Sequence, residues 1–152
     1  MARRSMTAGE QTLATSVFKT EIDFSRVEIL NEKWAFFQPN DTVMAPNGNI
    51  YYPPGHSGYA TDISSLDIHK KALLIHELTH VWQHQHGVNV TFRGVFERDY
   101  DYLPLTVTTI FGDLGIEEQG DLVRDYYYLT HGYHNNVWPP LSVYIAVIPW
   151  LP

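Results

Sequence analysis

The sequence predicts an α+β fold in one domain, with a small antiparallel sheet beside a pair of long helices. The 152-residue chain has the length of a single hydrophobic core, which predicts one domain over residues 1–152. Hydrophobic residues make up 44% and charged residues 18% of the chain, which excludes a disordered polymer. Short β-favouring segments gather between residues 22 and 53, and the two longest helical stretches follow them.

The first predicted helix begins at a capping box. The hydroxyl of Thr7 and the carboxylate of Glu10 have the spacing that satisfies free amides of a first turn, and the helix should run to about Phe18. Three β-favouring pieces follow, and a Pro-Asn-Gly-Asn turn separates the last two. They cover residues 27–30, 43–45 and 50–52. A small antiparallel sheet is the simplest structure for these pieces.

The strongest helical signal covers residues 66–86. This stretch contains neither Gly nor Pro, Ser64 or Ser65 can cap its start, and Gly87 is a typical C-cap. An apolar stripe, which predicts a buried face, is formed by Leu74, Leu78 and Val81. Residues 113–129 predict the second long helix.

The helix at residues 66–86 contains an H-E-x-x-H motif, with His76, Glu77 and His80. Residues four apart share a helix face, so both imidazoles can reach one zinc ion. Glu77, one step round the helix, can act as general base on a water held by that ion. The alternative is a solvated, histidine-rich surface, but the helical context favours a metal site.

A hydrolytic zinc site needs a third protein ligand. His86 lies ten residues after His76, as in metzincins, but Gln83 replaces the glycine that turns the chain in that pattern. All three methionines also precede the motif, so no Met-turn follows it. These departures disfavour His86.

A carboxylate on the second long helix is the other candidate. Glu117 and Glu118 can both serve, and helix geometry alone gives neither an advantage. Asp121 lies one turn after Glu117, where it could hydrogen-bond a ligand histidine and fix its tautomer, as in gluzincins. Gly120 on that side would permit close approach of the two helices.

Four segments of the chain resemble the Vgr-related HExxH zinc metallopeptidases. They are I-D-F-S-R-V at 22–27, M-A-P-N-G-N-I-Y at 44–51, L-I-H-E-L-T-H-V-W-Q-H-Q at 74–85 and I-E-E-Q-G at 116–120. The resemblance implies a zincin-like pair of helices carrying Zn2+. The second helix of that family commonly reads E-Q-Q, so the resemblance implies Glu117 as third ligand, with Glu118 replacing a Gln. Members occur alone or as extensions of type VI secretion spike proteins, which implies a spike component as partner.

Three further side chains could border the cleft. Tyr100 and Tyr102 lie in an aromatic segment, and His56 lies in a loop. A tyrosine hydroxyl or an imidazole there could stabilise a developing oxyanion. The alternative for the tyrosines is a packing role with the hydroxyl at the rim.

The sequence therefore predicts a zinc metallopeptidase that hydrolyses amide bonds in a protein or peptide substrate, with Glu77 as general base. The alternative is a non-catalytic zinc-binding adaptor of a secreted assembly. Structural zinc sites are closed and favour Cys, and the chain contains no Cys. This composition favours the open, catalytic kind of site.

Charge and hydropathy limit the partners and the cellular location that the sequence predicts. Acidic residues outnumber Lys and Arg by 17 to 10, for a net charge of -7, so nucleic acid is not an expected partner. The apolar stretch at residues 141–151 is too short to span a bilayer and predicts buried core. A polar stretch follows Arg3 and Arg4, so we expect no signal peptide and a chain that is cytoplasmic as synthesised. The family resemblance implies export by a non-classical secretion machine.

Overall fold

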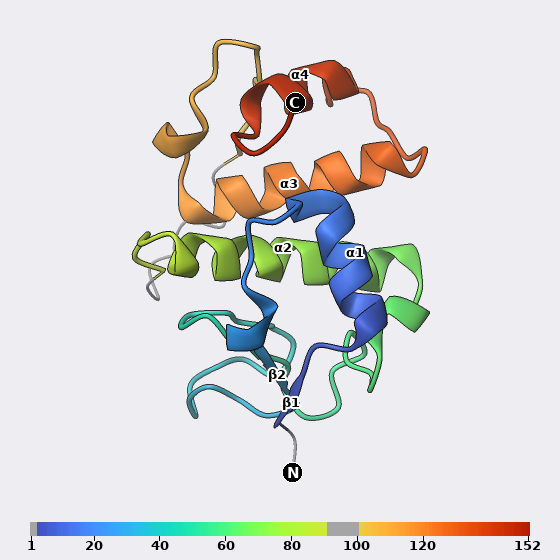
Figure 1. Cartoon of the computed structure of the whole chain (residues 1–152), viewed down its shortest axis with the longest axis vertical. Helices are drawn as coiled ribbons and strands as arrows, with labels where there is room; N and C mark the ends of the chain where they lie inside the picture. Colours follow the sequence, from blue (N-terminus) through green and yellow to red (C-terminus); the bar gives the residue numbers. More distant parts are fainter. Residues whose placement is uncertain (1–2, 91–100) are drawn as a thin grey trace.

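The computed structural model describes residues 3–90 and 101–152 and has the predicted α+β class (Figure 1). A small sheet lies at one end of the molecule, α2 and α3 run side by side across its middle, and α4 covers the far side of α3. The described strands and helices are β1 (Arg3–Ser5), α1 (Ala8–Phe18), η1 (Phe24–Arg26), β2 (Glu28–Leu30), β3 (Ile50–Tyr51), η2 (Ile63–Ser65), α2 (Ile68–Gln85), η4 (Phe111–Asp113), α3 (Ile116–Thr130) and α4 (Leu141–Val147).

The sheet has three strands in the order β1-β2-β3 and is mixed, so the prediction of a purely antiparallel sheet is wrong. β1 pairs antiparallel with β2, whereas β2 pairs parallel with β3. The turn predicted between residues 43–45 and 50–52 is confirmed, because Met44 and Tyr51 form an antiparallel bridge across it. The long connection from β2 lets β3 return in the same direction as β2. The buried amide of Gln38 holds that connection, because it donates to Thr42 O at 2.8 Å and to Tyr51 O at 3.0 Å.

The capping box predicted for the first helix is confirmed. Thr7 Oγ1 accepts from Glu10 N at 3.0 Å, and Glu10 Oε1 accepts from Thr7 N at 2.9 Å. The carboxylate of the fully buried Glu10 also accepts a hydrogen bond from each terminal nitrogen of Arg4, both at 2.8 Å, and one from Ile63 N at 2.7 Å. One carboxylate thus connects β1, α1 and the loop that leads to α2.

The two long helices form close to their expected positions. α2 begins at Ile68 because Asp67, rather than Ser64 or Ser65, caps it by accepting from the amides of two following residues at 3.0 and 3.1 Å. It ends at Gln85, and Gly87 has a φ of +81°, as a C-terminal glycine should. α3 begins later than expected, since the short helix η4 occupies the chain just before it.

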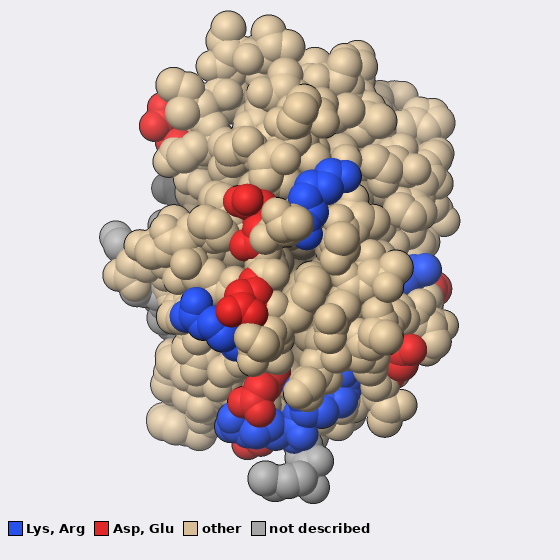
Figure 2. All heavy atoms as spheres, in the orientation of Figure 1, with Lys and Arg blue, Asp and Glu red and all other residues tan. Residues whose placement is uncertain are grey.

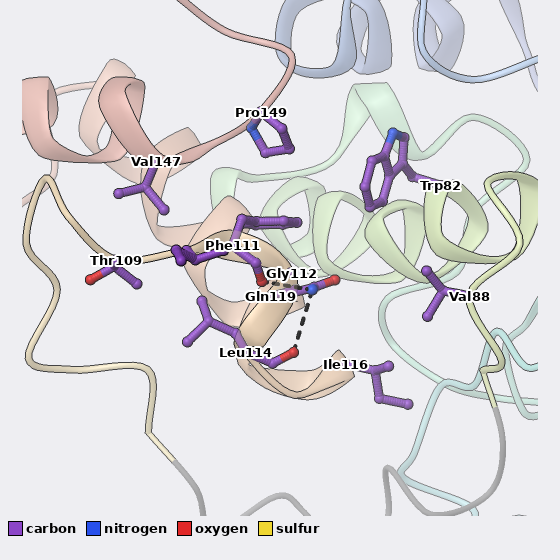
Figure 3. Close-up of a pocket in the computed structure, with 11 residues that line it drawn as sticks. Trp82, Val88, Thr109, Phe111, Gly112, Leu114, Ile116, Gln119, Val147 and Pro149 are labelled. Carbon is purple, nitrogen blue, oxygen red and sulfur yellow. Dashed lines mark hydrogen bonds between the residues drawn. The ribbon is translucent and has the colours of Figure 1, made fainter.

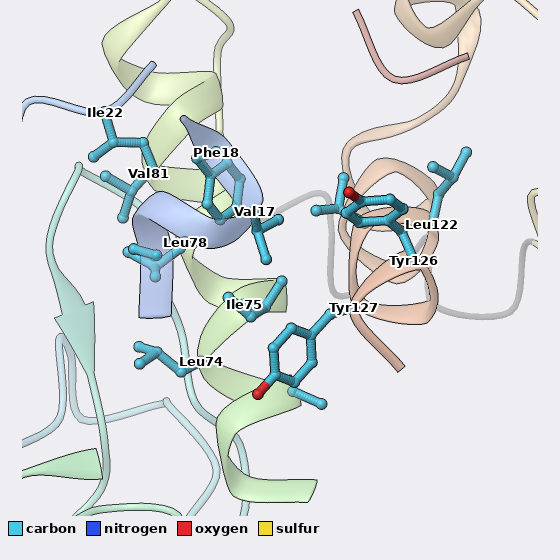
Figure 4. Packing of buried hydrophobic residues seen from close by; sticks show 14 of the residues in the cluster. Val17, Phe18, Ile22, Leu74, Ile75, Leu78, Val81, Leu122, Tyr126 and Tyr127 are labelled. Atoms are coloured by element: carbon cyan, nitrogen blue, oxygen red, sulfur yellow. The ribbon is translucent and has the colours of Figure 1, made fainter. Parts of the chain in front are cut away.

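The predicted apolar stripe of α2 is fully buried (Figure 4). Its residues Leu74, Leu78 and Val81 belong to one cluster with buried side chains of α1, α3, α4 and the sheet. In Figure 4, Ile75 lies near Val17 of α1 and Tyr127 of α3. This burial holds α2 firmly along one side, which leaves its motif residues in a defined position.

The apolar stretch at residues 141–151 is packed as predicted, with Tyr144 and Val147 of α4 buried. Among the described residues, no helix combines the length and the hydropathy needed to cross a bilayer. On the face shown in Figure 2, Lys and Arg side chains lie beside Asp and Glu side chains, and other residues form most of the surface.

Candidate metal centre

The antiparallel pairing of α2 and α3 brings two histidines and one glutamate together. Nε2 of His76 lies 3.0 Å from Glu117 Oε1, and Nε2 of His80 lies 3.2 Å from Glu117 Oε2. One donor atom from each residue falls within 4.8 Å of the other two. Two imidazole nitrogens and a carboxylate are a donor set that zinc uses in hydrolytic sites, so these residues fit the ion that the sequence predicts.

The three ligand candidates form a tightly coupled group of charges. Burial alone would lower the pKa of both histidines, but contacts with carboxylates outweigh it. Asp121 and Glu117 raise the pKa of His76 to about 10, and Glu117 raises the pKa of His80. Burial opposes ionisation of Glu117, yet hydrogen bonds from both imidazoles hold its pKa well below the usual range. A bound metal ion would have to displace the protons that these raised pKa values favour on the histidines.

Glu77 lies beside the ligand group without joining it. Its side chain is buried, and its Oε2 is 4.0 Å from Nε2 of His76. Burial raises the pKa of Glu77 to about 7, which is the range in which a carboxylate can exchange a proton near neutral pH. The position and the pKa both suit a general base.

The side of His76 that faces α3 is closely packed. Asp121 Oδ1 lies 3.0 Å from His76 Nδ1 and also 3.0 Å from Arg124 Nη1. Nδ1 of His76 has no partner of standard hydrogen-bond geometry among the described residues, so its contact with Asp121 is an ion pair with imperfect alignment. A Cβ at Gly120 would lie 2.8 Å from the His76 ring. Gly120 therefore permits the close approach that the sequence suggested.

The competing third-ligand candidates lie elsewhere. Glu118 Oε1 accepts from Gly115 N at 2.7 Å and so caps the start of α3. His86 stacks on Trp82, and its Nδ1 lies 2.8 Å from the carbonyl oxygen of Trp82. Because α2 continues as a helix beyond Gln83, His86 is carried away from the ligand group.

His56, which the sequence suggested could border the cleft, accepts a hydrogen bond from Gly58 N at 2.9 Å within its own loop.

Tyr102 is buried between α3 and α4. Its hydroxyl donates to Asp125 Oδ2 at 2.7 Å and lies 2.6 Å from the hydroxyl of Tyr144. These contacts fit the packing alternative, and a role in stabilising an oxyanion stays a prediction. Tyr100 lies outside the described residues.

Sequence reasoning missed two buried glutamines. Gln83 Oε1 lies 2.8 Å from Nδ1 of His80, and Gln83 Nε2 donates to Gln119 Oε1 at 2.8 Å. The spacing of three residues between His80 and Gln83 was the available signal, because such pairs meet on a helix surface.

A pocket of about 540 Å³ lies where α2 ends and α3 begins (Figure 3). It is lined mainly by apolar residues of α2, η4, α3, α4 and the adjoining loops, including Trp82, Val88, Phe111, Leu114, Ile116 and Val147. Gln119 contributes a polar group, and Figure 3 shows its amide bonded to backbone carbonyls of the wall.

No protein-family model matches the chain. The chain is 42% identical over 133 residues to the type VI secretion system spike protein VgrG2b of Pseudomonas aeruginosa, and the match covers 83% of this chain but 13% of the spike protein. Its fold is similar to the solved effector domain of P. aeruginosa VgrG2b, with a TM-score of 0.78 and 39% identity over 85% of this chain and 75% of that chain. This chain belongs to the family of the VgrG2b effector domain.

Proposed function

We propose that this chain is a zinc metallopeptidase that hydrolyses amide bonds in a protein or peptide and acts as a type VI secretion effector. One observation carries the hydrolytic part of the proposal. His76, His80 and Glu117 present three donors within 4.8 Å of one another, and the buried Glu77 lies beside them. A site that only held a structural ion would have no use for this second carboxylate, which is not a ligand.

Each residue has a defined task in this reaction. His76, His80 and Glu117 would hold Zn2+, which when bound polarises a carbonyl and acidifies a water. Glu77 takes a proton from the attacking water and returns it to the departing amine. Asp121 orients the imidazole of His76 through Nδ1. The side chains of His76 and Glu117 remain 12% and 25% exposed, so the ligand group is open to solvent.

The effector part of the proposal rests on the family. The relative is a spike protein, and the solved structure is its effector domain. We propose that this chain likewise leaves the producing cell through a type VI secretion machine, with a spike component as its partner. A non-catalytic zinc-binding adaptor is the competing function.

Glu77→Gln tests the proposed hydrolysis. The amide keeps the volume of the carboxylate but cannot accept the proton, so zinc content should be retained while cleavage of fluorescein-labelled casein falls by roughly 100- to 10,000-fold. Glu118→Gln is the matched control and should retain activity, because Gln can also cap α3. Undiminished cleavage by Glu77→Gln, or a zinc-loaded wild type that cleaves nothing, would favour the adaptor function.

A further inference from the structure

We propose that Gln83 and Gln119 form an amide relay that fixes the tautomer of His80, with the proton on Nδ1 and the lone pair of Nε2 facing the metal. The two glutamines are positioning residues, since neither lies in the ligand group. The inference rests on the proposed metal site, and its experiment separates the two.

The relay begins at backbone carbonyls near η4. Gln119 Nε2 donates to Phe111 O at 2.9 Å and lies 3.4 Å from Leu114 O. Backbone carbonyls only accept hydrogen bonds, so the NH2 group of Gln119 must face them. Its Oε1 is therefore directed away from them and toward α2, where it can only accept.

Acceptors also orient the side-chain amide of Gln83. Gln83 Nε2 donates to Gln119 Oε1 at 2.8 Å and to Ile116 O at 3.0 Å. Because both partners are acceptors, the NH2 group of Gln83 must point at α3. Its Oε1 is left facing Nδ1 of His80 at 2.8 Å. An oxygen accepts, so Nδ1 of His80 must carry a proton.

Burial makes this orientation firm. Gln83 is 0%, Gln119 5% and His80 4% exposed. Turning either amide over would set donor against donor or oxygen against oxygen and would leave a buried carbonyl unpaired. With Nδ1 committed as a donor, a neutral His80 presents an unprotonated Nε2 to the place where Glu117 Oε2 now lies, 3.2 Å away.

The two ligand histidines are thus held by different chemistry. Nδ1 of His76 faces a carboxylate, that of Asp121, whereas Nδ1 of His80 faces a neutral amide. Glu77, Glu117 and Asp121 already place three carboxylates around the site. An amide relay can orient His80 without adding a further negative charge.

The experiment compares zinc affinity, stability and tautomer in the full chain. Gln83→Met removes the acceptor and should weaken zinc binding by about 10- to 100-fold in competition with a chromophoric chelator. Gln119→Met should cost less, because Ile116 O still orients Gln83. Gln85→Met is the matched control on the same helix and should leave zinc affinity unchanged, since among residues 3–90 and 101–152 the Gln85 amide bonds to the backbone of Asp23 alone.

Gln83→Glu separates positioning from simple support of the fold. The carboxylate keeps an acceptor for Nδ1 of His80 but sets a second oxygen against Ile116 O and Gln119 Oε1. Gln83→Glu should therefore be less stable than Gln83→Met and yet bind zinc more tightly than Gln83→Met. Long-range 1H–15N spectra of the zinc-loaded wild type should show a proton on Nδ1 of His80.

Several results would overturn the relay. They are unchanged zinc affinity in Gln83→Met, an unprotonated Nδ1 in the loaded protein, or affinities that merely follow stability across the variants. A wild type that takes up no zinc would refute the proposed function instead. The same spectra of the zinc-free protein, recorded where His80 is neutral, would then decide the relay, because a proton on Nε2 would contradict it.

Discussion

The imidazole of His76 packs directly against the backbone of Gly120. A Cβ at Gly120 would lie 2.8 Å from Cε1 and 2.9 Å from Nδ1 of His76, closer than real Cβ contacts allow. The ring fills the space that any other residue at this position would occupy. Gly120 thus connects the packing of α2 against α3 to the position of His76, a proposed metal ligand.

Gly120→Ala should therefore weaken zinc binding, by on the order of tenfold, because the His76 ring must move to admit the methyl group. Replacing a helical glycine by alanine normally stabilises by about 1 kcal/mol, which should offset most of the strain in the metal-free protein. Zinc titration and chemical denaturation measure the two effects. Gly112→Ala is the control, since a Cβ there meets nothing within 4 Å. Equal zinc affinities in the two variants would contradict the expectation.

Glu117→Ala should reduce zinc affinity, whereas Glu118→Ala should reduce stability. Loss of Glu117 should remove most zinc affinity, because in the proposed site it supplies one of the three ligand atoms. Loss of Glu118 should leave zinc binding almost intact but cost about 1 kcal/mol of stability, because its carboxylate caps α3 through Gly115 N. Parallel zinc titrations and urea unfolding check both. If Glu118→Ala lost the zinc instead, the ligand assignment would pass to Glu118.

Local signals explain why the motif helix was predictable. The caps, the apolar stripe and the spacing of His76 and His80 all lie within one helix, so a sequence pattern records them. Glu117 comes from another helix, and geometry in the sequence could not separate it from Glu118; the family resemblance favoured Glu117. The structure distinguishes the two carboxylates, because one faces the histidines and the other caps its own helix.

The sheet and the glutamine relay depend on contacts between distant segments. A β-favouring piece does not encode all of its partners: β3 meets Met44 across the predicted turn, but it also pairs parallel with β2, which no local pattern indicated. β1 has the sequence Arg-Arg-Ser and no β-favouring residue, and it is held by the ion pair of Arg4 with Glu10. Gln83 and Gln119 lie in segments that the family resemblance covers, and the spacing of Gln83 from His80 permits a contact without predicting one. The structure supplies the contacts, because Gln83 Oε1 faces His80 and Gln83 Nε2 donates to Gln119.

Zinc affinity should rise with pH through the neutral range. Contacts with carboxylates raise the pKa of His76 to about 10, and that of His80 is also raised, so protons compete with the metal for both imidazoles. As pH rises, proton occupancy falls and the competition weakens, by up to about tenfold in affinity per pH unit for each proton released. Chelator competition at a series of pH values measures this slope.

Asp121→Asn supplies the internal comparison for that slope. It removes the carboxylate that raises the pKa of His76, so the dependence of zinc affinity on pH should become shallower. A zinc affinity independent of pH in the wild type, or an unaltered slope in Asp121→Asn, would contradict the assignment of these protons to the ligand group.

The ion pair of Arg4 and Glu10 should dominate the stability of the N-terminal region. Glu10 is 0% exposed and accepts hydrogen bonds from Arg4, Thr7 N and Ile63 N. Glu10→Gln leaves the partly buried guanidinium without its counter-charge and should destabilise the metal-free protein by about 3 kcal/mol. Urea unfolding, with zinc content as a check on the distant site, gives the measurement.

The exposed ion pair of Arg3 with Glu28 is the matched control. These side chains are 47% and 39% exposed, so Glu28→Gln should cost less than about 1 kcal/mol even though the two charges lie 2.6 Å apart.

Replacing both Arg4 and Glu10 by Met tests whether the ion pair or the hydrogen bonds to backbone amides set the contribution of Glu10. An ion pair alone could be exchanged for apolar packing at little cost, but the amides of Thr7 and Ile63 would lose their acceptor, so the double variant should stay destabilised by about 1 to 3 kcal/mol for each buried amide left unpaired. Equal losses in Glu10→Gln and Glu28→Gln would show that burial of the carboxylate does not set its contribution.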